Sequence, residues 1–361
     1  MKGAMTSAMT SAMIGRTIAL AIALIALVSL PGWIGGIFYV NIASQILFYA
    51  ILALGVNVLV GYAGLVSLGH AGLFGIAAYA AAYLLANGHG HPVAIVGALA
   101  VGLAATAVFA VLSLRATGIG FIMITLAVGE IVWGLAYRWI SITNGDNGIN
   151  VSSRPQPFGL SLASPVNFYY ASLVVFLLAL AATAVFVASP FGAALRGTRD
   201  QPRRMTALGY HVWLIRFFAC MFSGLLTCVA GLLFIYYNQF ISPQTLALTA
   251  SAEALLMAIS GGAGTLLGPA VGAAVVIVVK NVVSGVRFTD LSGPLLVVWG
   301  KSLLNGLFQH WNFLLGAIFV AIVILMPEGL VPGTVRLTRA GWRALGRRKA
   351  AAAPAAPKAM P

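Results

Sequence analysis

A few ionisable and hydroxyl side chains within long apolar stretches are the first candidates for chemistry in this chain. Glu130 lies in the middle of one apolar run, and His70 follows Ser67 by three residues near the start of another. An ionisable group at membrane depth is costly, which makes it a candidate for a pathway or for conformational coupling. The alternative for Glu130 is a neutral carboxyl group that hydrogen-bonds a neighbouring helix. The residues that we expect to line or gate a path are Ser67, His70, Thr125 and Glu130.

The sequence shows no motif for catalysis, metal binding or nucleotide binding. A metal site needs two or three convergent His, Cys or carboxylate ligands, and none stands three or four residues from His70. Neither H-E-x-x-H nor G-x-S-x-G occurs. The run Gly300-Lys301-Ser302 ends like a phosphate-binding loop, but Leu295 stands where that loop needs its first glycine. We therefore expect a chain that is not an enzyme and holds no metal or cofactor.

The composition places these residues in a membrane. Hydrophobic residues make up 61% of the 361 residues and charged residues 7%, whereas a soluble domain carries about 25% charged residues. These values exclude a water-soluble fold, a disordered chain and a nucleic-acid binder. No Asp, Glu, Lys or Arg occurs between Arg16 and Arg115, a stretch long enough for four helices of about 20 residues each. The sequence predicts an all-α, polytopic bundle of transmembrane helices.

We predict ten spans, with eight as the alternative. The predicted spans cover about residues 17–39, 42–60, 64–86, 92–113, 119–140, 168–188, 213–237, 245–260, 265–283 and 312–326. The segment 245–260 is short for a crossing, so residues 245–283 can also form one re-entrant hairpin buried in protein. We interpret the first run as a retained helix rather than a cleaved signal peptide, because apolar sequence continues beyond it. Glu253, near the start of the short segment, suits a helix N-terminus.

The positive charges indicate the orientation. The net charge is +14, from 20 Lys and Arg against 6 Asp and Glu, and most of the basic residues lie in the loop 189–212 or in the tail 332–361. Cytoplasmic loops of membrane proteins carry such an excess. Both span counts then place residues 1–16, the loop and the tail in the cytoplasm, and the loop 141–167 outside. We expect a transmembrane domain over residues 17–331, a disordered tail and a bacterial inner-membrane location.

Glycines recur every four residues near the ninth predicted span. Gly264, Gly268 and Gly272 put small residues on one helix face, which lets two helices approach closely. The favoured interpretation is tight packing within the chain, and a subunit interface is the alternative.

The loop 189–212 has the features of a docking helix. Asp200 suits an N-cap, Pro202 the first turn and Gly209 the left-handed residue that ends a helix. A helix of about two turns would stand off the membrane there and dock into a groove on a partner. An ordinary basic loop is the alternative. If the chain is a transporter, its energy must come from an ion gradient or from nucleotide hydrolysis. Proton-coupled carriers usually contain several ionisable residues within the membrane, and here Glu130 is nearly the only one. We therefore expect a separate ATPase as the energy source, and an ion-coupled secondary transporter is the rival hypothesis.

Several motifs resemble one known family, the permease subunits of branched-chain amino acid ABC importers, most closely the LivM type. The segment from Gly61 to Tyr79 is similar to the family signature around its second and third spans, and Thr143 to Ile149 is similar to its external motif. Arg196 to Tyr210 resembles the loop that engages the ATPase. The C-terminal pattern is matched by Phe240-Ile241-Ser242-Pro243, the segment 261–269 and Pro327-Glu328-Gly329-Leu330.

The resemblance implies an ABC importer permease fold with several partners. These are a second permease, as a homologue or a second copy, two ATPase subunits, an external solute-binding protein and membrane lipid. The substrate would be a branched-chain amino acid or a related small solute, since similar permeases carry urea and amides. Candidate external contacts are Asn144 and Asn147. The residues expected in the ATPase coupling loop are Arg196, Arg199, Asp200, Ala207 and Gly209.

Overall fold

The computed structural model describes residues 25–33, 36–151, 154–155 and 161–285, together with Gly316, Ile324, Gly329 and Leu330. Residues 25–33 are helical. The longer helices are α2 (Ile37–Asn57), α3 (His70–Ala86), α4 (His91–Ser113), α5 (Ile119–Arg138), α7 (Pro165–Ala188), α10 (Val212–Asn238), α11 (Leu248–Gly262) and α12 (Gly268–Gly285). The shorter elements are the π-helical turn η1 (Val58–Ala63), α6 (Ile140–Thr143), η2 (Gly145–Asn147), β1 (Ile149–Asn150), α8 (Pro190–Asp200), α9 (Pro202–Ala207), β2 (Phe240–Ile241) and η4 (Pro243–Leu246). The predicted helical bundle is confirmed.

The predicted spans between residues 42 and 283 each correspond to one of the longer helices. Within the described residues, five helices are long and apolar enough to cross a membrane, and three shorter apolar helices accompany them. The short ones are α3, α11 and the part of α12 up to Asn281. Residues 17–24, 34 and 35 of the predicted first span, and all of the last span, 312–326, except Gly316 and Ile324, lie outside the described residues. The choice between eight and ten crossings therefore stays a prediction.

Two predicted span boundaries are wrong. The second span begins at Ile37, so residues assigned to the end of the first span belong to α2. The third helix begins at His70 rather than at Gly64. Gly64 has φ +70°, in the left-handed region that glycine adopts without steric strain, and it ends η1. The chain then runs without helical structure through residues 65–69 before α3 starts.

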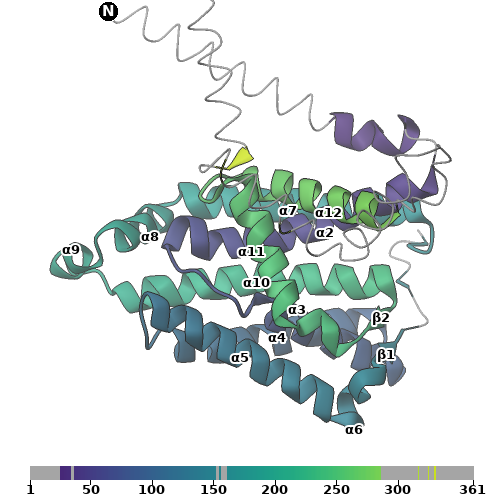
Figure 1. The fold of residues 1–361 in the computed structure, drawn as a ribbon, viewed down its shortest axis with the longest axis horizontal. Coiled ribbons are helices and arrows are strands. Elements are labelled where there is room, and N and C mark those ends of the chain that lie inside the picture. Colours follow the sequence, from purple (N-terminus) through teal and green to yellow (C-terminus); the bar gives the residue numbers. More distant parts are fainter. Residues whose placement is uncertain are drawn as a thin grey trace, which may run out of the picture.

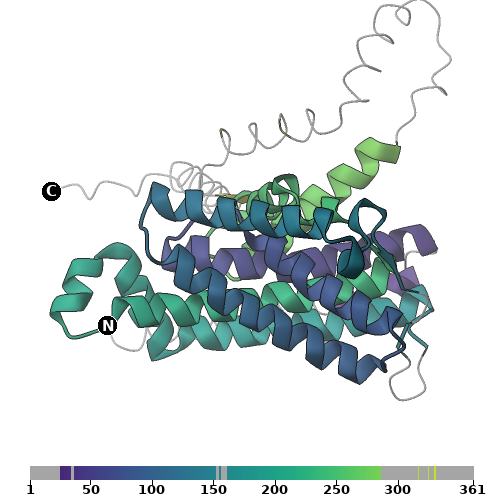
Figure 2. The same cartoon turned by 90° about the horizontal axis from the view of Figure 1, so that it is seen from below.

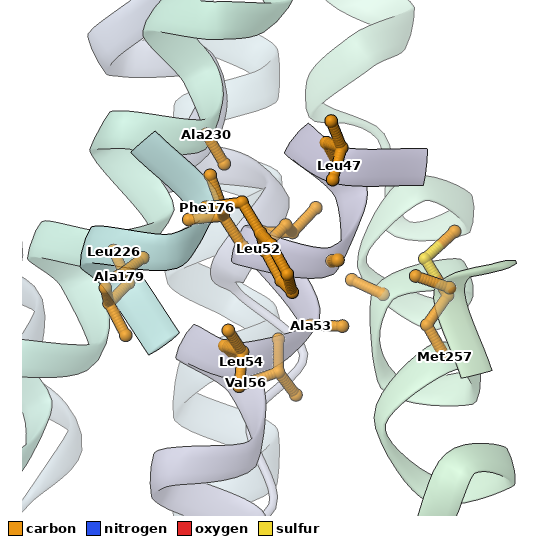
Figure 3. Close-up of a cluster of buried hydrophobic side chains, with 14 of the residues drawn as sticks. Leu47, Leu52, Ala53, Leu54, Val56, Phe176, Ala179, Leu226, Ala230 and Met257 are labelled. Carbon is orange, nitrogen blue, oxygen red and sulfur yellow. The ribbon is translucent and has the colours of Figure 1, made fainter. Parts of the chain in front are cut away.

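The core of the bundle surrounds α2 and α10. The most apolar window of α2 with η1 is 83% buried and that of α10 is 67% buried, against 22% for α5. A helix that is apolar on all sides has no polar face for solvent and suits such a central position. Figure 3 shows side chains of α2, among them Leu52 and Leu54, between Phe176 of α7 and Met257 of α11.

The outer helices pack on this centre from two sides. α7 and α12 pack against α2, while α3 packs against α10, α4 and α5. Figure 1 shows α2, α7 and α12 along one side of α10 and α3, α4 and α5 along the other. Because α5 is among the least buried long helices, it forms an outer face of the described bundle.

The two ends of the bundle carry different connections. At one end lie α6, η2 and the short antiparallel pair of β1 and β2, in which Ile149 faces Ile241. At the opposite end α8 and α9 project beyond the bundle (Figures 1 and 2). Both of these helices begin with proline in the first turn, where its missing N–H costs no hydrogen bond. The loops predicted to face opposite sides of the membrane therefore stand at opposite ends.

Candidate functional site

The start of α3 lies inside the bundle, and hydroxyl groups satisfy its backbone. The Leu68 N–H donates to Thr125 Oγ1 of α5 at 3.2 Å, and the Ala71 N–H donates to Ser251 Oγ of α11 at 3.0 Å. The Gly69 N–H donates to Ser67 Oγ at 3.4 Å. The first N–H groups of a helix have no partner within the helix. Ser251 of α11 supplies such a partner for Ala71 in the first turn of α3, and Thr125 of α5 holds Leu68 in the preceding 65–69 stretch.

His70 takes part in a buried relay between α3, α10 and α2. Its Nε2 lies 2.9 Å from Ser223 Oγ, and Ser223 Oγ donates to the Gly55 carbonyl at 2.6 Å. A hydroxyl group has one hydrogen to donate, so Nε2 carries the proton and donates to Ser223. Nδ1 of His70 has no partner within the described residues. The imidazole thus links three helices through Nε2, whereas Nδ1 makes no hydrogen bond within the described residues.

The structure brings together three of the four predicted path residues. Ser67, His70 and Thr125 are buried around the start of α3. Glu130 lies elsewhere, because it follows Gly129, which packs against Gly69, and so sits about 100° round α5 from that contact. Glu130 is half-buried, and within the described residues it has no hydrogen bond or ion pair. The neighbouring-helix partner considered for it is absent from this part of the chain.

The predicted external contacts lie in the loop between α5 and β1. Asn144 is exposed, has φ 60° and donates from Nδ2 to the Gly148 carbonyl at 2.9 Å. Asn147 is exposed. Thr143 anchors the loop by donating to backbone carbonyls of Ala136 and Trp139. Asn144 therefore shapes the turn with its side chain, whereas Asn147 presents its side chain at the surface.

Glu253 does not lie at a helix N-terminus, so that prediction is wrong. It is the sixth residue of α11, whose first turn has no acidic residue. Its carboxylate pairs instead with Lys280 Nζ of α12 at 3.0 Å.

Within the described residues, no group of three His, Cys or carboxylate side chains is arranged to hold a metal ion.

The segment between α7 and α10 contains two helices, not one. α8 begins at an unpredicted N-cap, Ser189, whose Oγ accepts from the Gly192 N–H at 3.2 Å. Asp200 is the last residue of α8, so its predicted N-cap role is wrong, and Gln201 precedes α9. The other two features are present: Pro202 lies in the first turn of α9, and Gly209 has φ +87° just beyond its end.

Two arginines of α8 and one of α10 donate to backbone carbonyls. Arg196 Nη1 donates to Val187 O at 3.1 Å, and Arg216 Nη2 donates to Thr198 O at 2.9 Å. Arg199 Nη1 donates to the Gly61 carbonyl of η1. Asp200 is exposed and lies 3.8 Å from Arg199 Nε. α8 is thus held to the bundle at several points by its arginines and by the buried Leu195.

α9 makes few contacts with the bundle. None of its residues is buried, and Ala207 is exposed. Leu208, just after the helix, has 64% of its surface exposed, and Tyr210 has 49%. A basic helix followed by exposed apolar side chains at the tip of a projection is suited to contact another protein.

Two of the cavities among the described residues are of interest although no site residue predicted from sequence lines them. A cavity of about 360 Å³ between α3, α4 and α5 has apolar walls that include Ile76, Val132 and Leu246. A second, of about 310 Å³, combines aromatic rings with the amides of Gln45 and Asn238. The apolar residues carried no signal of a cavity, because the same residue types fill an ordinary core. Asn238 is the last residue of α10, where polar side chains are common, whereas Gln45 lies within α2 and donates from Nε2 to Tyr237 Oη at 3.1 Å.

The glycines near α12 form a close contact between α11 and α12. A Cβ atom at Gly272 would overlap the Met257 carbonyl, and one at Gly268 would lie 2.6 Å from the Gly262 carbonyl. Gly264 precedes α12 and lies in the turn with φ +80°, so it does not share a helix face with the other two. This geometry supports packing within the chain.

Comparisons with known proteins agree with this architecture. Residues 38–323 match the family model described as the permease component of the branched-chain amino acid transport system. The high-affinity branched-chain amino acid transport system permease protein LivM of Escherichia coli K12 is 28% identical, over 82% of this chain and 70% of its own length. Its counterpart from Salmonella typhimurium LT2 is 27% identical over the same shares. No solved structure matches the chain. With its apolar helices and a family match over more than half its length, the chain is a multi-pass membrane protein of the branched-chain amino acid transport permease family, a non-catalytic transport subunit.

Proposed function

We propose that this chain forms half of the translocation path of an importer for branched-chain amino acids or related small solutes. The two LivM relatives carry that substrate class in their names. An ABC permease works with a partner ATPase, a binding protein and a second permease. Here we assign two ATPase subunits, a solute-binding protein that delivers substrate from outside, and a second permease that is a homologue or another copy. Alternating access follows if the ATPases bind one conformation of the permeases more tightly than the other.

The projection of α8 and α9 carries this proposal. It is basic, exposed along α9 and attached to the bundle through α8. A partner that binds α9 can therefore move the bundle through α8. This end is assigned to the cytoplasm by its arginines, with both termini on the same side and the 141–167 loop outside, in the bacterial inner membrane.

Glu130 supports the position of the second permease. Its half-buried carboxyl group has no partner within the described residues, and lipid offers no group to pair with it. We infer that this face of α5 lies against the second permease or a water-filled path between the two subunits. We assign Ser67, His70 and Thr125, which are buried around the start of α3, as the gate of that path. The apolar cavity beside α5 matches the aliphatic side chain of such a substrate.

The test of the ATPase partnership is the change Gly209→Arg. The left-handed φ of +87° becomes strained with any side chain, by about 1–2 kcal/mol, and the end of α9 is displaced. We expect the ATPase to be lost when the complex is purified from native membranes, and uptake to fall at least tenfold.

A matched control for that change is Gly88→Arg. Gly88 has φ +79° and open space around it, like Gly209, but it lies in the turn between α3 and α4. The Gly88→Arg change should leave both ATPase copurification and substrate uptake close to wild type. Uptake that continues without any ATPase, driven by a proton or sodium gradient, would instead establish a secondary transporter.

A further inference from the structure

Segments far apart in the sequence meet beside η1, in a cluster that we call the glycine junction: Asn57, Gly61, Gly264 and Thr265. Asn57 Nδ2 donates to the Thr265 carbonyl at 2.9 Å, and Asn57 Oδ1 accepts from the Gly264 N–H at 2.8 Å. One buried side chain of α2 thus satisfies both a donor and an acceptor in the turn between α11 and α12. This arrangement fixes that turn to the end of α2.

Backbones touch directly in the junction. A Cβ atom at Gly61 would overlap the Gly264 nitrogen, so any side chain there would separate the two segments. Gly329 adds a third segment, because a Cβ atom at that residue would overlap the Gly262 Cα atom. Packing this close leaves no room for independent movement of η1 and the α11–α12 turn.

Arg199 connects the projection to the junction. It donates from Nη1 to the Gly61 carbonyl, and its Cγ lies 2.8 Å from the position that a Cβ atom of Gly64 would take. Arg196 and Arg216, by contrast, bond to carbonyls at the end of α7 and within α8. Among these three arginines, Arg199 alone donates to a carbonyl of η1.

The junction leads directly to the start of α3. After Gly64, only residues 65–69 separate η1 from His70. That stretch is held by Thr125 of α5, and α3 is held at its first turn by Ser251 of α11. A displacement of Gly61 and Gly64 is therefore passed to the buried start of α3 through only five residues of chain, which are not helical.

We propose that Arg199 is a positioning residue that transmits the movement of the α8–α9 projection to the glycine junction, and through it to the start of α3. This inference rests on the proposed function, in which an ATPase moves the projection. Arg199 makes no contact with substrate in this account. It determines how much of the ATPase movement becomes opening and closing of the path.

The experiment compares Arg199→Met with Arg199→Lys in the complete importer, reconstituted with its ATPases, second permease and binding protein. Met keeps an unbranched stem over Gly64 but has no donor for the Gly61 carbonyl, whereas Lys keeps a stem and a charged donor. Three quantities are measured: ATPase copurification, ATP hydrolysis and substrate transported per ATP. With Arg199→Met we expect normal copurification, hydrolysis within about twofold of wild type and about tenfold less transport per ATP, the size expected for a lost charged hydrogen bond. Arg199→Lys should recover at least half of that loss on a logarithmic scale.

Arg115→Met is the matched control, because Arg115 is exposed in the turn after α4 and no described residue bonds its side chain. It should transport normally per ATP. If Arg199→Met transports normally per ATP, or if transport falls only in proportion to lost ATPase, Arg199 does not transmit movement and the inference is overturned. A chain that copurifies with no ATPase in any variant contradicts the proposed function itself, which is a separate result.

Discussion

At the scale of single residues, buried polar side chains link helices inside this bundle by hydrogen bonds. Ser223 accepts from His70 and donates to the Gly55 carbonyl, while Asn57 holds the α11–α12 turn. Each joins helices that are distant in the sequence. A buried hydrogen-bonding group contributes modestly when paired, but leaving its partner unpaired costs more. The partners of these residues therefore decide their importance.

Two buried serines allow this to be tested. Ser223→Ala leaves the His70 N–H without its acceptor, and we expect a loss of about 1–3 kcal/mol of stability. Ser172 is equally buried, but its Oγ has no partner within the described residues, so Ser172→Ala should be neutral or stabilising. Thermal unfolding in detergent gives both values. Equal midpoints for the two variants would contradict the relay.

At the scale of elements, close backbone contact determines how helices pair. α11 and α12 are short, with 15 and 18 residues, and at about 1.5 Å per residue α11 spans roughly 22 Å, less than a bilayer core of about 30 Å. Their pairing depends on glycines that leave space for a neighbouring carbonyl. The Glu253–Lys280 ion pair adds a second link between them.

The prediction at this scale concerns Gly272→Ala. The added Cβ would overlap the Met257 carbonyl and force α11 and α12 apart, which we expect to cost about 1–3 kcal/mol, as in overpacked cores. Gly134→Ala on α5 is the control, because nothing lies near its added Cβ and alanine favours a helix by about 1 kcal/mol. Thermal stability in detergent should fall for the first variant and hold or rise for the second. A stable, active Gly272→Ala protein would show that the contact is dispensable.

At the scale of the whole molecule, the two ends of the bundle should face opposite sides of the membrane. Asn147 is exposed at the end with β1 and β2, and Thr206 is exposed on α9 at the other. In intact cells, a thiol reagent that cannot cross the membrane should label Asn147→Cys and not Thr206→Cys. Inverted vesicles should reverse the result. The native Cys220 and Cys228 are buried and give little background. Labelling of both sites from one side would contradict the predicted orientation.

The sequence by itself determined the membrane class, the helices and several of their ends. Apolar runs of span length leave a helix as the way to satisfy backbone groups in lipid, and local signals such as Pro202 and Gly209 act within one turn. The same reasoning failed at Gly64 and Asp200, where η1 and α8 are stabilised by contacts with other helices. A helix cap or a turn can be predicted from the neighbouring sequence only when the groups that stabilise it are close in the sequence.

Only the tertiary structure decided which residues meet. Ser67, His70 and Thr125 lie together around the start of α3, whereas Glu130 lies apart from them on α5. That these residues line or gate a path stays a prediction. The hydrogen bonds of Asn57, Ser223 and Arg199 have no sequence signal, since each joins a partner at least 130 residues away. Composition and periodicity report the environment of a residue, whereas a hydrogen bond between distant helices depends on their packing, and packing exists only in the folded chain.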